Sequence, residues 1–206
     1  MKRFLAWIVF ALAISPAVAL AQGNHEYSPL VEKTVNYKNW TLNDLKDNKP
    51  VDLRSLVNGK SSSWLFTLRR GVLTGATKRR WLPVFYEKYK AQGFGVIGVS
   101  EYGMRDAVAN FFGPNGSPYP VVSESELRED KQRRHTTPTA RATGDKRNWG
   151  SPWNIFLDPA TFAKTGDVLT EKAWVVNGEL IEADVDKFIA DHLKASTAAA
   201  IVPCKQ

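Results

Sequence analysis

Two continuous apolar runs separated by an amphipathic segment constrain the fold of this chain more than any other feature. The runs "SSWLFTL" and "FGVIGVS" predict buried strands over residues 64–68 and 94–100. Between them, apolar residues at three- and four-residue spacing predict a helix over residues 79–92, namely Leu82, Phe85, Tyr86 and Tyr89. Gly93 follows, as a glycine commonly does where a helix ends. This order predicts a right-handed crossover between parallel strands and hence an α/β domain.

The segments after residue 100 continue the alternation of strands and helices. Their patterns predict a short helix over residues 104–112, strands over 119–124, 153–158 and 168–178, and a final amphipathic helix over 183–193. A long polar stretch, about residues 125–150, is interpreted as an insertion ahead of the strand at 153. The expected architecture is therefore a central mixed sheet flanked by helices.

The first 21 residues have the three parts of an export signal. Lys2 and Arg3 precede the apolar run "FLAWIVFALAI", and small residues at 19–21 precede Gln22. The run is shorter than the roughly 20 residues that a membrane span requires. We therefore expect cleavage near Ala21 and a periplasmic or secreted protein, with a retained anchor as the alternative. The predicted divisions of the chain are a signal peptide (1–21), an irregular arm (22–39), one domain (40–194) and a flexible tail (195–206).

Charge and cysteine content limit the classes of function. The formal net charge of +7 falls to +5 when the two positive charges of Lys2 and Arg3 are removed, and acidic residues are scattered among the basic ones. We interpret this balance as a solvated surface, which argues against nucleic acid and leaves a membrane surface as a weaker candidate partner. Cys204 is the only cysteine, so no internal disulfide can form, whereas a disulfide to another molecule stays open.

Residues from about 40 to 193 resemble the thioredoxin-like superfamily. The resemblance is to the redoxin branch shared by exported thiol-disulfide oxidoreductases and alkyl-hydroperoxide-reductase-type peroxiredoxins, and it is carried by "LVNGKSSSWLFTL", "WLPVFYEKY", "FGVIGVS" and "GSPWNIFLD". In that family a Cys-x-x-Cys pair stands between the first strand and its helix. Alignment on Pro83 puts Gly75 and Lys78 in place of the cysteines, with Thr74 before them and Ala76 and Thr77 between them. Alignment on "RRG" instead puts Thr74 at the first cysteine position, so neither register contains sulfur.

The missing cysteines limit the chemistry that can be inferred from the resemblance. Thiol-disulfide exchange needs a thiolate, and neither threonine nor lysine forms such a redox couple. We therefore expect a redox-inactive binding or accessory module for a protein or peptide partner, acting in envelope protein maturation, with no cofactor. An oxidoreductase or peroxidase that uses Cys204 or a partner's thiol is the alternative, and a structural envelope domain is the second alternative.

The resemblance also implies a proline that faces the site in the cis form. Ser151-Pro152, directly before a predicted strand, is the best match, and Pro138 is a rival placement. Trp149 and Trp153 flank the pair and could form an aromatic wall of a peptide groove. The alternative is an ordinary proline at a strand entry with tryptophans that belong to the core.

The remaining polar residues give weaker signals. His25, His135 and His192 are far apart in sequence, which argues against a metal site, and His192 is expected to face solvent on the final helix. The basic residues of the insertion could bind a partner or simply be solvated, namely residues 131–135 with Arg141, Lys146 and Arg147. The basic residues at 78–80 could similarly hold an anion at a helix start.

Overall fold

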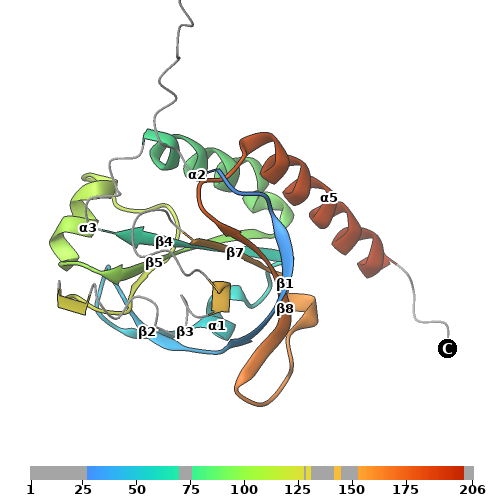
Figure 1. Ribbon diagram of the computed structural model, residues 1–206, viewed down its shortest axis with the longest axis horizontal. Helices are drawn as coiled ribbons and strands as arrows, with labels where there is room; N and C mark the ends of the chain where they lie inside the picture. Colours follow the sequence, from blue (N-terminus) through green and yellow to red (C-terminus); the bar gives the residue numbers. More distant parts are fainter. Residues whose placement is uncertain (1–26, 70–75, 128, 131–141, 145–152, 202–206) are drawn as a thin grey trace, which may run out of the picture.

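The computed structural model describes residues 27–69, 76–127, 129–130, 142–144 and 153–201, and these form an α/β domain around one mixed sheet (Figure 1). The strand order in this eight-stranded sheet is β1-β8-β7-β4-β5-β6-β2-β3. The elements in chain order are β1 (Val31–Lys38), β2 (Thr41–Asp44), β3 (Pro50–Asp52), α1 (Leu53–Val57), β4 (Ser62–Arg69), α2 (Ala76–Tyr89), the 3-10 helix η1 (Lys90–Gln92), β5 (Phe94–Tyr102), α3 (Arg105–Phe112), β6 (Val121–Ser123), β7 (Trp153–Leu157), the 3-10 helix η3 (Pro159–Thr161), β8 (Val168–Asn177) and α5 (Glu182–Ile201). The predicted fold class is confirmed.

The centre of the sheet is the parallel unit that the two apolar runs predict. Strand β4 pairs in parallel with β5, and β5 pairs in parallel with β6, while β7 pairs antiparallel with β4. Helix α2 and η1 end at Gly93, whose φ of 88° is a left-handed conformation that glycine adopts without strain. The helices α2, α3 and α5 contribute apolar side chains to a core that covers one face of this sheet, among them Leu82, Val108 and Ile189.

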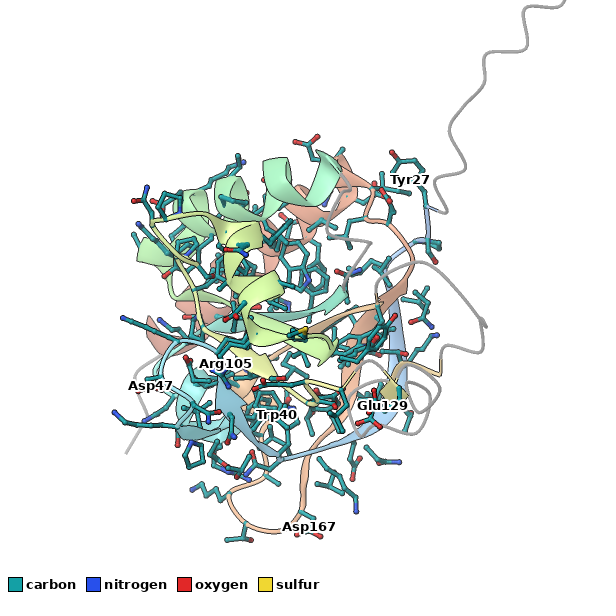
Figure 2. The ribbon with its side chains drawn as sticks, turned by 90° about the vertical axis from the view of Figure 1, so that its left-hand side faces the viewer. Tyr27, Trp40, Asp47, Arg105, Glu129 and Asp167 are labelled. Carbon is teal, nitrogen blue, oxygen red and sulfur yellow. The ribbon has the colours of Figure 1, made fainter. Side chains whose placement is uncertain are left out.

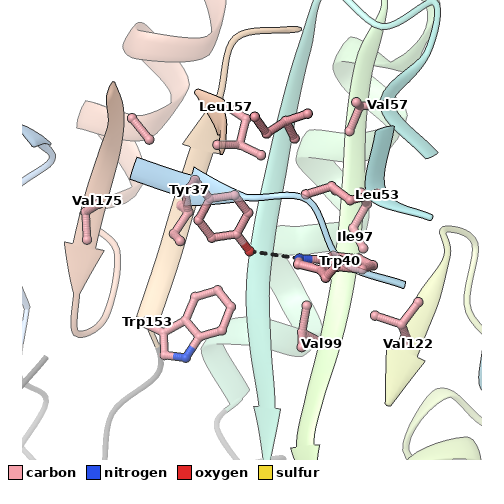
Figure 3. Close-up of a cluster of buried hydrophobic side chains, with 13 residues drawn as sticks. Tyr37, Trp40, Leu53, Val57, Ile97, Val99, Val122, Trp153, Leu157 and Val175 are labelled. Carbon is pink, nitrogen blue, oxygen red and sulfur yellow. Dashed lines mark hydrogen bonds between the residues drawn. The ribbon is translucent and has the colours of Figure 1, made fainter. Parts of the chain in front are cut away.

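A second core fills the opposite face, because the sheet curls around it. Strands β1 and β2 lie far apart in the strand order, yet only residues 39 and 40 separate them, so the chain crosses this face directly. The crossing buries Tyr37 and Trp40 together with Leu53 and Val57 of α1 (Figure 3). The indole Nε1 of Trp40 donates a hydrogen bond to the hydroxyl of Tyr37 at 3.1 Å. Burial raises the pKa of Tyr37 well above its usual value, and the nearby charge of Glu124 acts in the same direction.

The structure corrects two of the predicted divisions, the irregular arm and the flexible tail. The predicted irregular arm contains β1, because pairing with the distant strand β8 supplies backbone hydrogen bonds that no local pattern indicates. The segment after Trp40 contains β2, which pairs with the distant β6, and β3, which pairs with β2. The final helix begins at Glu182 and runs to Ile201, so residues 195–201 of the predicted flexible tail are helical. Alanine, the strongest helix former, dominates that extension. Over the part of the chain that the structure describes, no helix is both long and apolar enough to cross a membrane.

Candidate functional site

The candidate site lies where the parallel strands end, at an edge of the sheet that we call the carboxyl edge. Strands β4, β5 and β6 end there at Arg69, Tyr102 and Ser123. Since β7 is antiparallel to β4 with Asn154 opposite Phe66, its first residue, Trp153, lies at the same edge. Crevices outside the carboxyl ends of parallel strands are the usual place for ligand sites in α/β folds.

The structure describes only part of the site that the sequence predicts. Ala76, Thr77 and Lys78 form the first turn of α2, so the helix begins within the predicted cysteine-free segment. The other predicted site residues lie outside the described residues, namely Thr74, Gly75, Trp149, Ser151, Pro152 and Cys204. The predicted cis proline and the role of Cys204 therefore remain predictions.

Trp153 belongs to the core, which corrects its assignment to the wall of a groove. Its side chain is fully buried and packs with Ile155 and Val99 in the cluster that Figure 3 shows. Its indole Nε1 donates a hydrogen bond to Oε1 of Glu101 at 2.7 Å. A side chain with no exposed surface cannot contact a docked peptide, so Trp153 acts on the site only by holding the first residue of β7 in place.

Glu101 is a site residue that the sequence reasoning missed. It is 2% exposed and lies at the end of β5, where the pairing with β4 shifts register between Leu68 and Arg69. A buried carboxyl group is rare unless it has a hydrogen-bond partner, and Trp153 provides one. The signal in the sequence was a charged residue directly after seven residues that read as a buried strand.

A second acidic residue lies beside Glu101 on the neighbouring strand. Ser100 of β5 pairs with Ser123 of β6, and the backbone N–H of Glu124 donates to the carbonyl oxygen of Ser100 at 2.8 Å. Glu101 and Glu124 are therefore neighbours at the carboxyl edge, each directly after one of the two paired serines.

Exposed apolar side chains concentrate at the carboxyl edge. Among the described residues six large apolar side chains are exposed, and five of them adjoin this edge with exposures of 38% to 57%: Tyr27, Val31, Met104, Leu127 and Ile181. The sixth, Val84, lies in the middle of α2. Four segments of the chain, residues 27–31 and the neighbourhoods of 104, 127 and 181, contribute these side chains, which we call the apolar edge set.

The strand pairing places each member of the apolar edge set. Met104 follows β5, and the loop of Leu127 follows β6 and is tied to β5 by the bond from the N–H of Gly103 to the carbonyl of Ser125. Figure 2 views the molecule from the side on which α3 lies in Figure 1, and it labels Tyr27, another member of the apolar edge set.

The other three members lie at the β1–β8 side of the same edge. Val31 begins β1 and pairs with Val175 near the end of β8, and Ile181 follows that end. Tyr27, four residues before Val31, forms a parallel β-bridge with Glu179, two residues before Ile181. The apolar edge set thus flanks the start of β7 from both sides.

His192 lies away from the carboxyl edge and is less exposed than predicted. Its ring stacks on Phe188 at 5.3 Å between centroids and meets Trp174 edge-on at 4.8 Å. Its Nε2 is 3.6 Å from Oδ2 of Asp158, and the side chain is 17% exposed. Within the described ranges no three His, Cys, Asp or Glu side chains lie close enough to hold a metal ion. His25 and His135 fall outside those ranges.

Comparison with known proteins identifies the fold. No family model and no curated protein matches the sequence. Among solved structures, the peroxidoxin BcpB from Mycobacterium tuberculosis superposes with a TM-score of 0.53 at 19% identity, over 81% of this chain and 97% of that one. A putative thioredoxin from Neisseria meningitidis gives a TM-score of 0.50 at 14% identity, over 84% and 100% of the two chains.

A third solved structure leads to the same assignment. The C-terminal domain of a putative thiol-disulfide oxidoreductase from Bacteroides thetaiotaomicron gives a TM-score of 0.50 at 15% identity, over 83% of this chain and 96% of that one. The chain therefore has the thioredoxin-like fold that the sequence resemblance implied.

Proposed function

We propose that this thioredoxin-like chain is a redox-inactive module that binds a protein partner through its carboxyl edge. The observation that carries the proposal is the apolar edge set, in which five of the six exposed large apolar side chains of the described residues adjoin one edge of the sheet. Apolar side chains that are exposed at one place on a folded domain can mark an interaction site, whereas singly scattered ones need no explanation.

The residues at the start of α2 support a role other than disulfide exchange. That chemistry begins with a thiolate, whose pKa is lowered at a helix N-terminus. Ala76, Thr77 and Lys78 occupy the first turn of α2, and Cys204 is the only cysteine of the chain. The fold thus keeps the position of a redox site without a group that can form a mixed disulfide there.

The expected place of action is outside the cytoplasm. The first 21 residues have the composition of a cleaved export signal, which supports this location. We infer a protein or peptide partner in the cell envelope and a role in the maturation of envelope proteins.

The test of the binding site uses matched surface variants. Met104→Ser, Leu127→Ser and Ile181→Ser together remove three side chains of the apolar edge set, and Val84→Ser is the control because Val84 is 51% exposed away from that edge. Exposed positions tolerate such changes within about 0.5 kcal/mol each. We expect the triple variant to lose capture of cross-linked partners from an envelope extract by about tenfold or more, and the control to capture normally. Equal capture by both variants would refute the site.

The proposal that the chain is redox-inactive has its own test. We expect no catalysis of insulin reduction by dithiothreitol, either by the natural chain or by Cys204→Ser. Turnover that the Cys204→Ser variant abolishes would instead support the alternative, an oxidoreductase with a displaced thiol. Peroxide consumption, measured with the same two proteins, extends the comparison to peroxidase chemistry.

A further inference from the structure

A separate hollow lies at the opposite end of β6 from the carboxyl edge. Its volume is about 620 Å³, it is open to solvent on one side, and it is lined by the C-terminal half of α3, the loop over residues 113–120 and the turn after β2. The backbone N–H of Leu45 donates to the carbonyl of Val121 at 2.8 Å, which fixes that turn against the start of β6. Sites for small ligands commonly measure roughly 300–1,000 Å³, so the hollow has the size of such a site.

The apolar wall of the hollow is held rigidly. Tyr119 is 5% exposed, and its ring meets the rings of Phe112 and Tyr86 edge-on at 5.9 and 5.7 Å. The hydroxyl of Ser117 donates to the carbonyl of Tyr119 at 2.7 Å and fixes the loop. Three prolines restrict the same loop further, at 114, 118 and 120. A wall held in this way loses little entropy when a ligand binds.

The charges around the hollow leave one cation available. Oδ1 of Asp44 accepts a hydrogen bond from the backbone N–H of Lys46 at 2.6 Å, so this carboxylate is turned into its own loop. The guanidinium of Arg105 is occupied by the carbonyl oxygens of Asp44 and Leu45 and by Glu126. Lys46 is exposed and lines the hollow, and its ammonium group makes no hydrogen bond or ion pair with the described residues, although the charge of the neighbouring Asp47 acts on it.

We propose that the hollow between α3, the loop 113–120 and Lys46 binds a small organic carboxylate with an aromatic or branched apolar body. The apolar body packs against Phe112 and Tyr119, and the carboxylate pairs with Lys46 at the rim. A cationic ligand would be repelled by the positive charge of Lys46 and is disfavoured. This site is distinct from the carboxyl edge, and its occupation does not depend on the proposed partner binding.

The test compares three probes that share one apolar body. 3-Phenylpropionate, 3-phenylpropan-1-ol and 3-phenylpropan-1-amine are titrated into the ¹⁵N-labelled full chain, and backbone amide shifts are followed. We expect shifts confined to residues 44–46 and 109–121, with the carboxylate binding about two- to fivefold tighter than the alcohol and the amine binding most weakly. Shifts elsewhere, no binding of any probe, or equal affinity for the three probes would overturn the proposal.

Two variants separate the charge from the apolar wall. Lys46→Gln is expected to lower the affinity for 3-phenylpropionate to that for the alcohol, while the affinity for the alcohol stays unchanged. Lys49→Gln is the control, because Lys49 pairs with Asp47 and does not line the hollow. Ala109→Leu fills the hollow from an exposed position of α3 and is expected to weaken both probes at least tenfold. Unchanged carboxylate affinity in either Lys46→Gln or Ala109→Leu would refute the assignment.

Discussion

Replacing Trp153 by phenylalanine tests the hydrogen bond that links the start of β7 to the end of β5. Trp153 is fully buried, and its Nε1 donates to Oε1 of Glu101, which is 2% exposed, at 2.7 Å. Phenylalanine keeps a ring at the position but removes the donor. The buried carboxyl group of Glu101 then loses the hydrogen bond from this indole.

Two contributions set the expected cost. Removing one hydrogen bond to a buried charged group costs about 1–3 kcal/mol. The smaller ring of phenylalanine also removes buried apolar area and leaves a small cavity, which adds roughly 1 kcal/mol. We therefore expect Trp153→Phe to lower the free energy of unfolding by about 2–4 kcal/mol.

The assay is urea unfolding followed by circular dichroism, with two companion variants. Trp40→Phe is the matched control, since Trp40 is 8% exposed and donates to the neutral hydroxyl of Tyr37 at 3.1 Å; its loss is expected to be smaller by about 1 kcal/mol. Glu101→Gln keeps an acceptor for the indole and should cost less than Trp153→Phe. A loss below about 0.5 kcal/mol for Trp153→Phe would refute the argument.

Two further predictions concern stability. Gly93→Ala should lower the free energy of unfolding by about 1–3 kcal/mol, because φ is 88° and the new Cβ would lie 2.6 Å from Oγ of Ser61. Gly59→Ala is the control, with φ 73° and no atom within 4 Å of the new Cβ, and it should cost less in the same denaturation assay. The hydrogen bond from Lys88 lowers the pKa of Asp186, so this carboxylate stabilises the fold above its unfolded pKa of about 3.9, and that contribution is lost as pH falls through the lower folded pKa. Asp186→Asn should therefore be less stable at neutral pH, and its unfolding free energy should converge with that of the natural chain below about pH 4; a constant difference down to pH 2 would contradict this linkage.

The central elements could be predicted because their signals are local. Seven of the nine residues of β5 form one apolar run that reads as a buried strand, and the apolar spacing of α2 repeats on a helical period. Strand β1 carried no such signal. Its side chains are mostly exposed, and it is a strand because β8 lies beside it, far away in sequence.

The sequence indicated only part of what the structure describes at the carboxyl edge. The sequence indicated the cysteine-free junction before α2, and the structure begins that helix at Ala76. It could not indicate that Trp153 is buried, because a tryptophan beside a proline suits both a groove and a core. Glu101 was missed since its burial depends on the indole of a residue 52 positions later.

The sequence by itself therefore determined the parallel β4–α2–β5 unit and the absence of thiol chemistry at its junction, because periodicity and residue identity are local properties of the chain. The tertiary structure alone decided which residues share a surface. Tyr27, Met104 and Ile181 belong to segments that no local pattern relates, and only the pairing of distant strands brings them to one edge. The same holds for the hollow beside Lys46, whose walls meet because β2 pairs with β6. Such contacts depend on the free energy of closing the whole sheet rather than on the preference of any one segment.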